Sequence, residues 1–317
     1  MMQRAAAAIL LCLAAPAFAW ASGPGVHLLE ADRVLDALVE SDPEWAALAE
    51  LPLARSYLHF GAVSPDFEKA TETIPFGHQH GLSYYLLDKA QSEKPEFSLF
   101  ALGHLCHQGS DGAMEALIVP TFFSSAPIGL YSLFGEYADG RADSEGIVES
   151  FGDLILGDWL SLVDMLFDFW YEDDEAKERA SELFYWYCET GAEHFSMTVD
   201  CDLVKAELEG VLAKADGIVG MMSREEAKQF VQMLTDQPLD ELVNLATSGM
   251  LTSMLSGQVE PGPEYDAEVA RFKNSVFVDP EFWTLYEQLD MLGPSYALDA
   301  LDVKPPSGSW PIYDANA

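Results

Sequence analysis

The sequence predicts an all-α protein, a multi-helix bundle, from two observations. Apolar residues recur at spacings of three and four along most of the chain, whereas the alternation typical of a strand is missing. Hydrophobic residues make up 49% of the 317 positions, which is ample for a packed core. The predicted helices are 27–40, 80–90, 99–117, 147–170, 175–195, 203–215, 224–234 and 239–255. Proline and glycine breaks separate them at Pro52 and within 64–77, 120–140 and 256–266.

The first 19 residues have the composition of a secretory signal peptide. Arg4 gives a basic start, residues 5–15 form an apolar run, and Ala17-Phe18-Ala19 is a small-x-small cleavage site. The run is too short to span a bilayer comfortably, and no later segment reaches about 18 uninterrupted apolar residues. We therefore expect a secreted or periplasmic protein whose mature chain begins at Trp20, although cleavage after Ala21 is also chemically allowed.

Charge narrows the range of partners. The chain has 53 acidic and 16 basic residues, a formal net charge of −37, so a polyanion would be repelled and no stable nucleic-acid complex is expected. The excess of acidic residues is also typical of a protein adapted for solubility or for high salt, in which negative charge covers the whole surface. Cys188 and Cys201 can pair in an oxidising compartment, but the sequence leaves that pairing open.

One predicted helix carries an unexpected polar stripe. His104, His107, Asp111 and Glu115 fall within an arc of roughly 80° on the apolar segment 99–117. A lone buried histidine is usually a hydrogen-bonded core residue. A histidine followed by an aspartate four residues later is different, because the two side chains project together as a divalent ion requires, and imidazole with carboxylate suits zinc.

Further ligand types stand at the starts of other predicted helices. His27 opens one helix, His78 and His80 open another, and Asp66 lies in a Ser-Pro-Asp loop between them. Their number strengthens the prediction of a metal site.

The order of these motifs resembles the secreted zinc-dependent phospholipase C family, which shares its all-helical fold with single-strand-specific zinc nucleases. The shared pattern is a Trp and a His, then GAVSPDF, then a His that opens a helix, then ALGxLxHxxxD, over about residues 20–155. The resemblance implies a bundle of the zinc-dependent phospholipase C type with extra C-terminal helices. It divides the chain into a signal peptide (1–19), a metal-binding helical core (20–165), additional helices packed on the core (166–300) and a C-terminal tail (301–317).

The resemblance also implies a ligand set. Two or three zinc ions are expected, with Asp111 bridging two of them and Asp66 acting either as a ligand or as the catalytic base that orients the water. The implied ligands are the terminal amine and carbonyl of Trp20 and the side chains of His27, Asp66, His80, His107 and Asp111. Four histidines have no assigned counterpart: His59, His78, His104 and His194.

Two glutamates depart from the family pattern. Glu115 stands where another histidine is usual, and Glu145 stands at the His of an HxxxE motif whose Glu is matched by Glu149. Oxygen ligands shift the preference toward calcium or manganese at this Glu-rich position. For Glu145 and Glu149, a solvated helix face is the alternative interpretation.

The expected activity is metal-dependent phosphodiester hydrolysis by a metal-bound water, with a phospholipid headgroup or small phosphodiester as substrate and a transient membrane-surface contact. Aromatic residues in 167–175 and 184–187 can line a substrate cleft, but at helical spacing they more often form core. Two alternatives stay open. The short spacing from Trp20 to His27 favours a zinc nuclease, and the replaced histidines favour a non-catalytic secreted protein with a degenerate metal site. The sequence indicates no oligomeric state.

Overall fold

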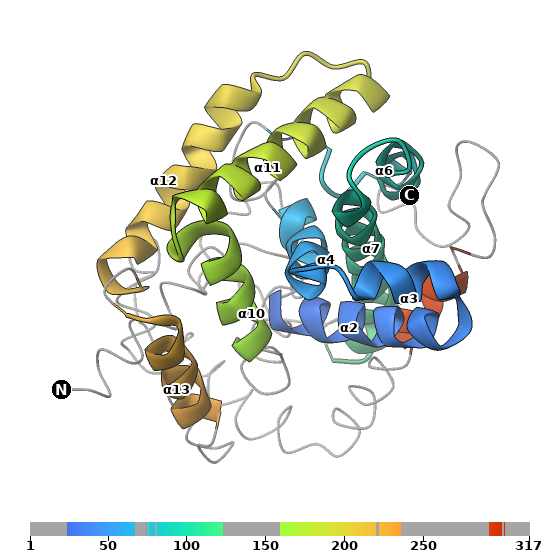
Figure 1. The fold of residues 1–317 in the computed structure, drawn as a ribbon. Coiled ribbons are helices and arrows are strands. Elements are labelled where there is room, and N and C mark those ends of the chain that lie inside the picture. Colours follow the sequence, from blue (N-terminus) through green and yellow to red (C-terminus); the bar gives the residue numbers. More distant parts are fainter. Residues whose placement is uncertain are drawn as a thin grey trace, which may run out of the picture.

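A computed structural model describes residues 24–66, 74, 76–79, 81–122, 159–219, 222–235, 292–299 and 301 (Figure 1). Within these ranges the regular structure is helical and no strand occurs, which confirms the all-α prediction. The elements are α2 (Pro24–Ser41), α3 (Pro43–Ala49), α4 (Ala54–Val63), the 3-10 turn η2 (Ser64–Asp66), α6 (Leu82–Ala90), α7 (Pro95–Phe122), α10 (Trp159–Leu166), the π-helical turn η4 (Phe167–Tyr171), α11 (Asp174–His194), α12 (Cys201–Val219), α13 (Arg224–Thr235) and a last helix at 292–299.

Most predicted helices agree with the described ones, and three described helices were not predicted: α3, α4 and the helix at 292–299. The short α3 begins with a side-chain cap, because Asp42 accepts a hydrogen bond from the backbone N–H of Glu44 at 2.8 Å. Helix α4 has 10 residues and is buried along nearly its whole length. The predicted helix 239–255 lies outside the described residues.

Helix α7 runs through the middle of the bundle and packs closely against α4 (Figure 1). A methyl group at Gly61 would collide with the backbone carbonyl of Phe100, and one at Gly103 would collide with that of Leu58. The two backbones therefore touch, which only glycine allows. This contact fixes the end of α4 against the polar stripe of α7.

The helices after residue 159 pack on this core through aromatic side chains and ion pairs. Phe169 and Tyr187 are fully buried, which supports the core interpretation of the two aromatic segments. On α13, Arg224 contacts Asp168 at 2.5 Å and Glu172 at 2.8 Å. Helices α11 and α12 lie side by side in Figure 1.

A disulfide joins α11 to α12. It links Cys188 to Cys201, whose Cα atoms are 6.0 Å apart. The pairing that the sequence left open is therefore present. In the described part of the chain, no helix combines the length and apolar character needed to cross a bilayer.

Candidate metal centre

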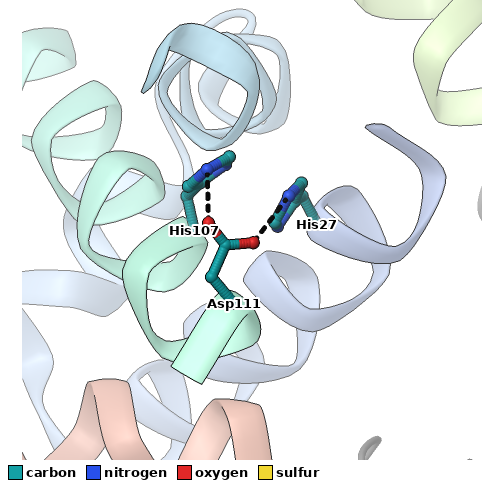
Figure 2. Close-up of side chains that lie close together, drawn as sticks. All are labelled: His27, His107 and Asp111. Atoms are coloured by element: carbon teal, nitrogen blue, oxygen red, sulfur yellow. Dashed lines mark ion pairs between the residues drawn. The ribbon is translucent and has the colours of Figure 1, made fainter. Parts of the chain in front are cut away.

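Five of the chain's titratable side chains converge where α2, η2 and α7 meet. His27 comes from the first turns of α2, Asp66 from η2, His78 from the turn that follows, and His107 and Asp111 from α7. Figure 2 shows His27 and His107 directed at the same Asp111 carboxylate from their two helices. The converging set combines imidazole nitrogens with carboxylate oxygens, which are zinc-ligand types.

The ligand atoms of Asp66, His78, His107 and Asp111 lie within a few ångströms of one another around Nε2 of His107. The Nε2 atom of His107 lies 3.2 Å from Nε2 of His78, 3.2 Å from Oδ2 of Asp111 and 3.9 Å from Oδ1 of Asp66. The Nε2 atom of His78 lies 3.3 Å from Oδ1 of Asp66 and 3.8 Å from Oδ2 of Asp111. Ligands about 2.0–2.1 Å from a tetrahedral zinc ion are about 3.3–3.4 Å apart. Asp66, His78 and His107 form one group that could hold a metal ion, and His27, His107 and Asp111 form a second.

The orientation of His107 is set by a backbone group. Its Nδ1 donates a hydrogen bond to the carbonyl oxygen of Ala62 at 2.7 Å, so in the neutral ring Nε2 carries the lone pair. A metal-binding histidine usually holds its second ring nitrogen in this way. The contact follows from the fold, because the close packing of α4 on α7 brings the Ala62 carbonyl to the ring.

The turn that carries His78 is held against η2. A methyl group at Gly77 would collide with the carbonyl of Pro65, so the turn lies directly on the residue before Asp66. Phe76 anchors the turn in the core, where its ring contacts that of Tyr187. These contacts bring His78 next to Asp66.

His27 fits a metal ligand better than it fits a core histidine. Its side chain is fully buried, and neither ring nitrogen makes a hydrogen bond within the described part of the chain. Burial, reinforced by the neighbouring His107, lowers the pKa of His27 to about 3, so the ring is neutral near pH 7. It stacks on His107 at 3.8 Å between ring centroids. A buried imidazole without hydrogen bonds is costly, and a metal ion at Nε2 would reduce that cost by giving one of the two ring nitrogens a partner.

The two oxygens of Asp111 face different sides of the cluster. Oδ2 points to His107 and His78, whereas Oδ1 lies 3.6 Å from Nε2 of His27. Burial raises the pKa of Asp111, but His107, His27 and His78 together outweigh it and hold that pKa well below its usual range. A carboxylate that is ionised and turned two ways is suited to join two cations.

Solvent reaches the cluster from one side. The side chains of Asp66, His27 and His107 are fully buried, whereas His78 is 24% and Asp111 17% exposed. A small molecule would therefore meet the His78 and Asp111 edge first.

Among the predicted ligands, His27, Asp66, His107 and Asp111 come together. Trp20, His80, Glu145 and Glu149 lie outside the described residues, as does the side chain of Glu115. The sequence interpretation missed His78, which had no assigned role although it is two residues from His80 in the same segment.

The remaining buried histidines on these helices have partners outside the cluster. His104 Nδ1 lies 2.8 Å from the hydroxyl of Ser83, and His59 Nε2 lies 3.0 Å from Asp32. Both fit the ordinary role of a core histidine. Comparison of the chain with models of protein families, with curated protein sequences and with solved structures gave no match.

Proposed function

We propose that the protein is a secreted, zinc-dependent phosphodiesterase of the phospholipase C type, acting on a phospholipid headgroup or a small phosphodiester. The observation that carries this proposal is the cage of Asp66, His78 and His107, beside which Asp111 turns one oxygen to His107 and the other to His27. Such a cage can hold one ion, and His27 with Asp111 can hold a second beside it.

The donor set supports zinc as the metal. Each of the two groups offers two imidazoles and one carboxylate, and His107 is common to both. Imidazole ligands favour zinc over calcium or magnesium, which prefer oxygen alone. When bound, zinc polarises phosphoryl oxygens and lowers the pKa of coordinated water toward ~7.

The residues around the cage have distinct tasks in this proposal. Asp66 is fully buried and faces His78 and His107, which supports its role as a ligand over a role as a base that meets substrate. The Ala62 carbonyl keeps the Nε2 lone pair of His107 directed into the cage. The partly exposed edge at His78 and Asp111 admits the phosphodiester, while the buried side excludes bulk water.

The charge of the chain and its disulfide support the rest of the proposal. A net charge of −37 disfavours a long nucleic acid, whereas a single phosphodiester group carries little charge to repel. The Cys188–Cys201 disulfide is typical of a protein outside the reducing cytoplasm.

Metal analysis with activity assays tests the proposal on the chain that begins at Trp20. Zinc should be found in the purified protein, and a chromogenic phosphodiester and phosphatidylcholine should be hydrolysed in a chelator-sensitive manner. His107→Ala should lose both metal and activity. His194→Ala, which changes an exposed histidine outside the cluster, should keep both.

Three outcomes would contradict the proposal in different ways. Faster hydrolysis of single-stranded DNA than of either lipid or chromogenic substrate would favour the nuclease alternative. Bound zinc without hydrolysis of any of the three would favour a non-catalytic metal protein. Absence of zinc from both the unaltered chain and His107→Ala would overturn the metal site itself.

A further inference from the structure

The last helix of the described chain, 292–299, lies against both helices that supply the metal ligands. Its residues Gly293, Pro294 and Ala297 are buried, and Ala297 belongs to the hydrophobic core. The helix is the red segment in Figure 1. The helix therefore lies next to the candidate metal centre.

The contact with α7 occurs between two ligands. Gly109 lies between His107 and Asp111 on α7, and a methyl group at Gly109 would lie 2.8 Å from the carbonyl oxygen of Gly293 and 3.4 Å from the backbone nitrogen of Ala297. A real side-chain carbon essentially never comes closer than 3.0 Å to another atom, so the two backbones are in direct contact.

The contact with α2 occurs one turn after His27. Glu30 is fully buried, and a methyl group at Gly293 would collide with its carboxylate. The carboxylate therefore lies directly against the backbone of helix 292–299 at Gly293. The same glycine of the last helix thus touches both α2 and α7.

We propose that helix 292–299 is a positioning element of the metal centre, which sets the distance between α2 and α7 through Gly293 and thereby the distance between His27 and Asp111. This inference rests on the proposed metal site. Metal–ligand distances tolerate only about ±0.2 Å, so a shift of about 1 Å between the two helices would spoil the coordination. Helix 292–299 is far from the ligands in sequence, and its residues act on the metal only through α2 and α7.

Two substitutions separate the helices at this contact. Gly109→Ala places a methyl group against the backbone carbonyl of Gly293 and so pushes α7 away from the last helix. Gly293→Ala must displace either the last helix or the buried Glu30 carboxylate. The matched control is Gly210→Ala on α12, where an added methyl group meets nothing within 4 Å. All three variants are made in the full mature chain.

The measurements are the zinc dissociation constant and the visible absorption spectrum of the cobalt(II)-loaded protein. We expect Gly109→Ala and Gly293→Ala to weaken zinc binding by about 10- to 100-fold, the range seen when groups that orient ligands are lost. Their cobalt spectra should change, because band positions follow coordination geometry. Gly210→Ala should keep the affinity and spectrum of the unaltered protein, and all variants should keep their helical circular dichroism.

A double variant guards against the case in which Gly109→Ala fails to fold. Glu30→Ala removes the carboxylate that a methyl group at Gly293 would meet. The loss of zinc-binding free energy in the double variant Glu30→Ala/Gly293→Ala should therefore be smaller than the sum of the losses in the two single variants, because the two residues are in contact.

The failures are distinguishable. If the unaltered protein binds zinc and cobalt but Gly109→Ala and Gly293→Ala match Gly210→Ala in affinity and spectrum, the positioning role is overturned while the metal site stands. If the losses of zinc-binding free energy in Glu30→Ala and Gly293→Ala add up in the double variant, the positioning role is also overturned. If the unaltered protein binds no more zinc than His107→Ala, the metal site falls and the positioning role falls with it.

Discussion

Replacing His27 with leucine should change the stability of the protein in opposite directions with and without zinc. In the metal-free protein His27 is fully buried, and its ring nitrogens make no hydrogen bond within the described residues. Removing a buried polar group of this kind gains about 1–3 kcal/mol. Losing the ring contact with His107 costs about 0.5–1.5 kcal/mol. In chelator, His27→Leu should therefore be more stable than the unaltered chain by about 1 kcal/mol.

With zinc the order should reverse. At a free zinc concentration of about 1,000 times the dissociation constant, binding stabilises the unaltered protein by about 4.1 kcal/mol. Loss of one ligand, taken as about 100-fold in affinity, removes about 2.7 kcal/mol of this stabilisation. His27→Leu should then be less stable than the unaltered chain by about 2 kcal/mol.

Urea unfolding followed by far-ultraviolet circular dichroism, in chelator and in zinc at neutral pH, measures both differences. His194→Leu is the control, because it removes an exposed imidazole outside the cluster, and it should show no such reversal. If His27→Leu destabilises the protein equally in chelator and in zinc, His27 is a structural core residue and the argument from its buried nitrogens is refuted.

Two further predictions concern stability. Replacing both Cys188 and Cys201 with serine should lower the free energy of unfolding by about 3 kcal/mol, the loop-entropy value for a separation of 13 residues, and the oxidised protein should show the same loss after addition of a reductant. Because the pKa of His27 is lowered from 6.5 to about 3 in the folded state, the unfolded chain binds a proton first as the pH falls. The metal-free protein should therefore lose stability below about pH 6.5, and His27 alone should account for about 2 kcal/mol of the loss at about pH 5. In His27→Leu this part of the pH dependence should be missing.

Some of the site could be predicted from sequence because a helix fixes the spacing of its own side chains. His107 and Asp111 are four residues apart on α7, so their contact at 3.2 Å follows once the segment is helical. The contact of His27 with Asp111 was an expectation from motif order, since nothing in local spacing brings α2 to α7. That contact depends on packing between helices.

The place of His78 in the site could not be predicted for the same reason. Nothing in the local pattern of its turn brings it to Asp66. The structure brings His78 to Asp66 because Gly77 lies against Pro65 and the buried ring of Phe76 holds the turn to α11. Both constraints come from residues distant in sequence, so the side chain that enters the cage is decided by tertiary contacts.

The missed helix α4 matters to the site as much as any ligand. It is a short helix of 10 residues, and all of them except Arg55 are buried. Yet its last turn presents the Ala62 carbonyl that fixes the His107 ring, and it reaches that position only because Gly61 and Gly103 let α4 and α7 touch. A side chain at either glycine would move that carbonyl away from Nδ1. The tautomer of His107, and with it the lone pair directed at the metal, therefore depends on two glycines that carry no ligand atom.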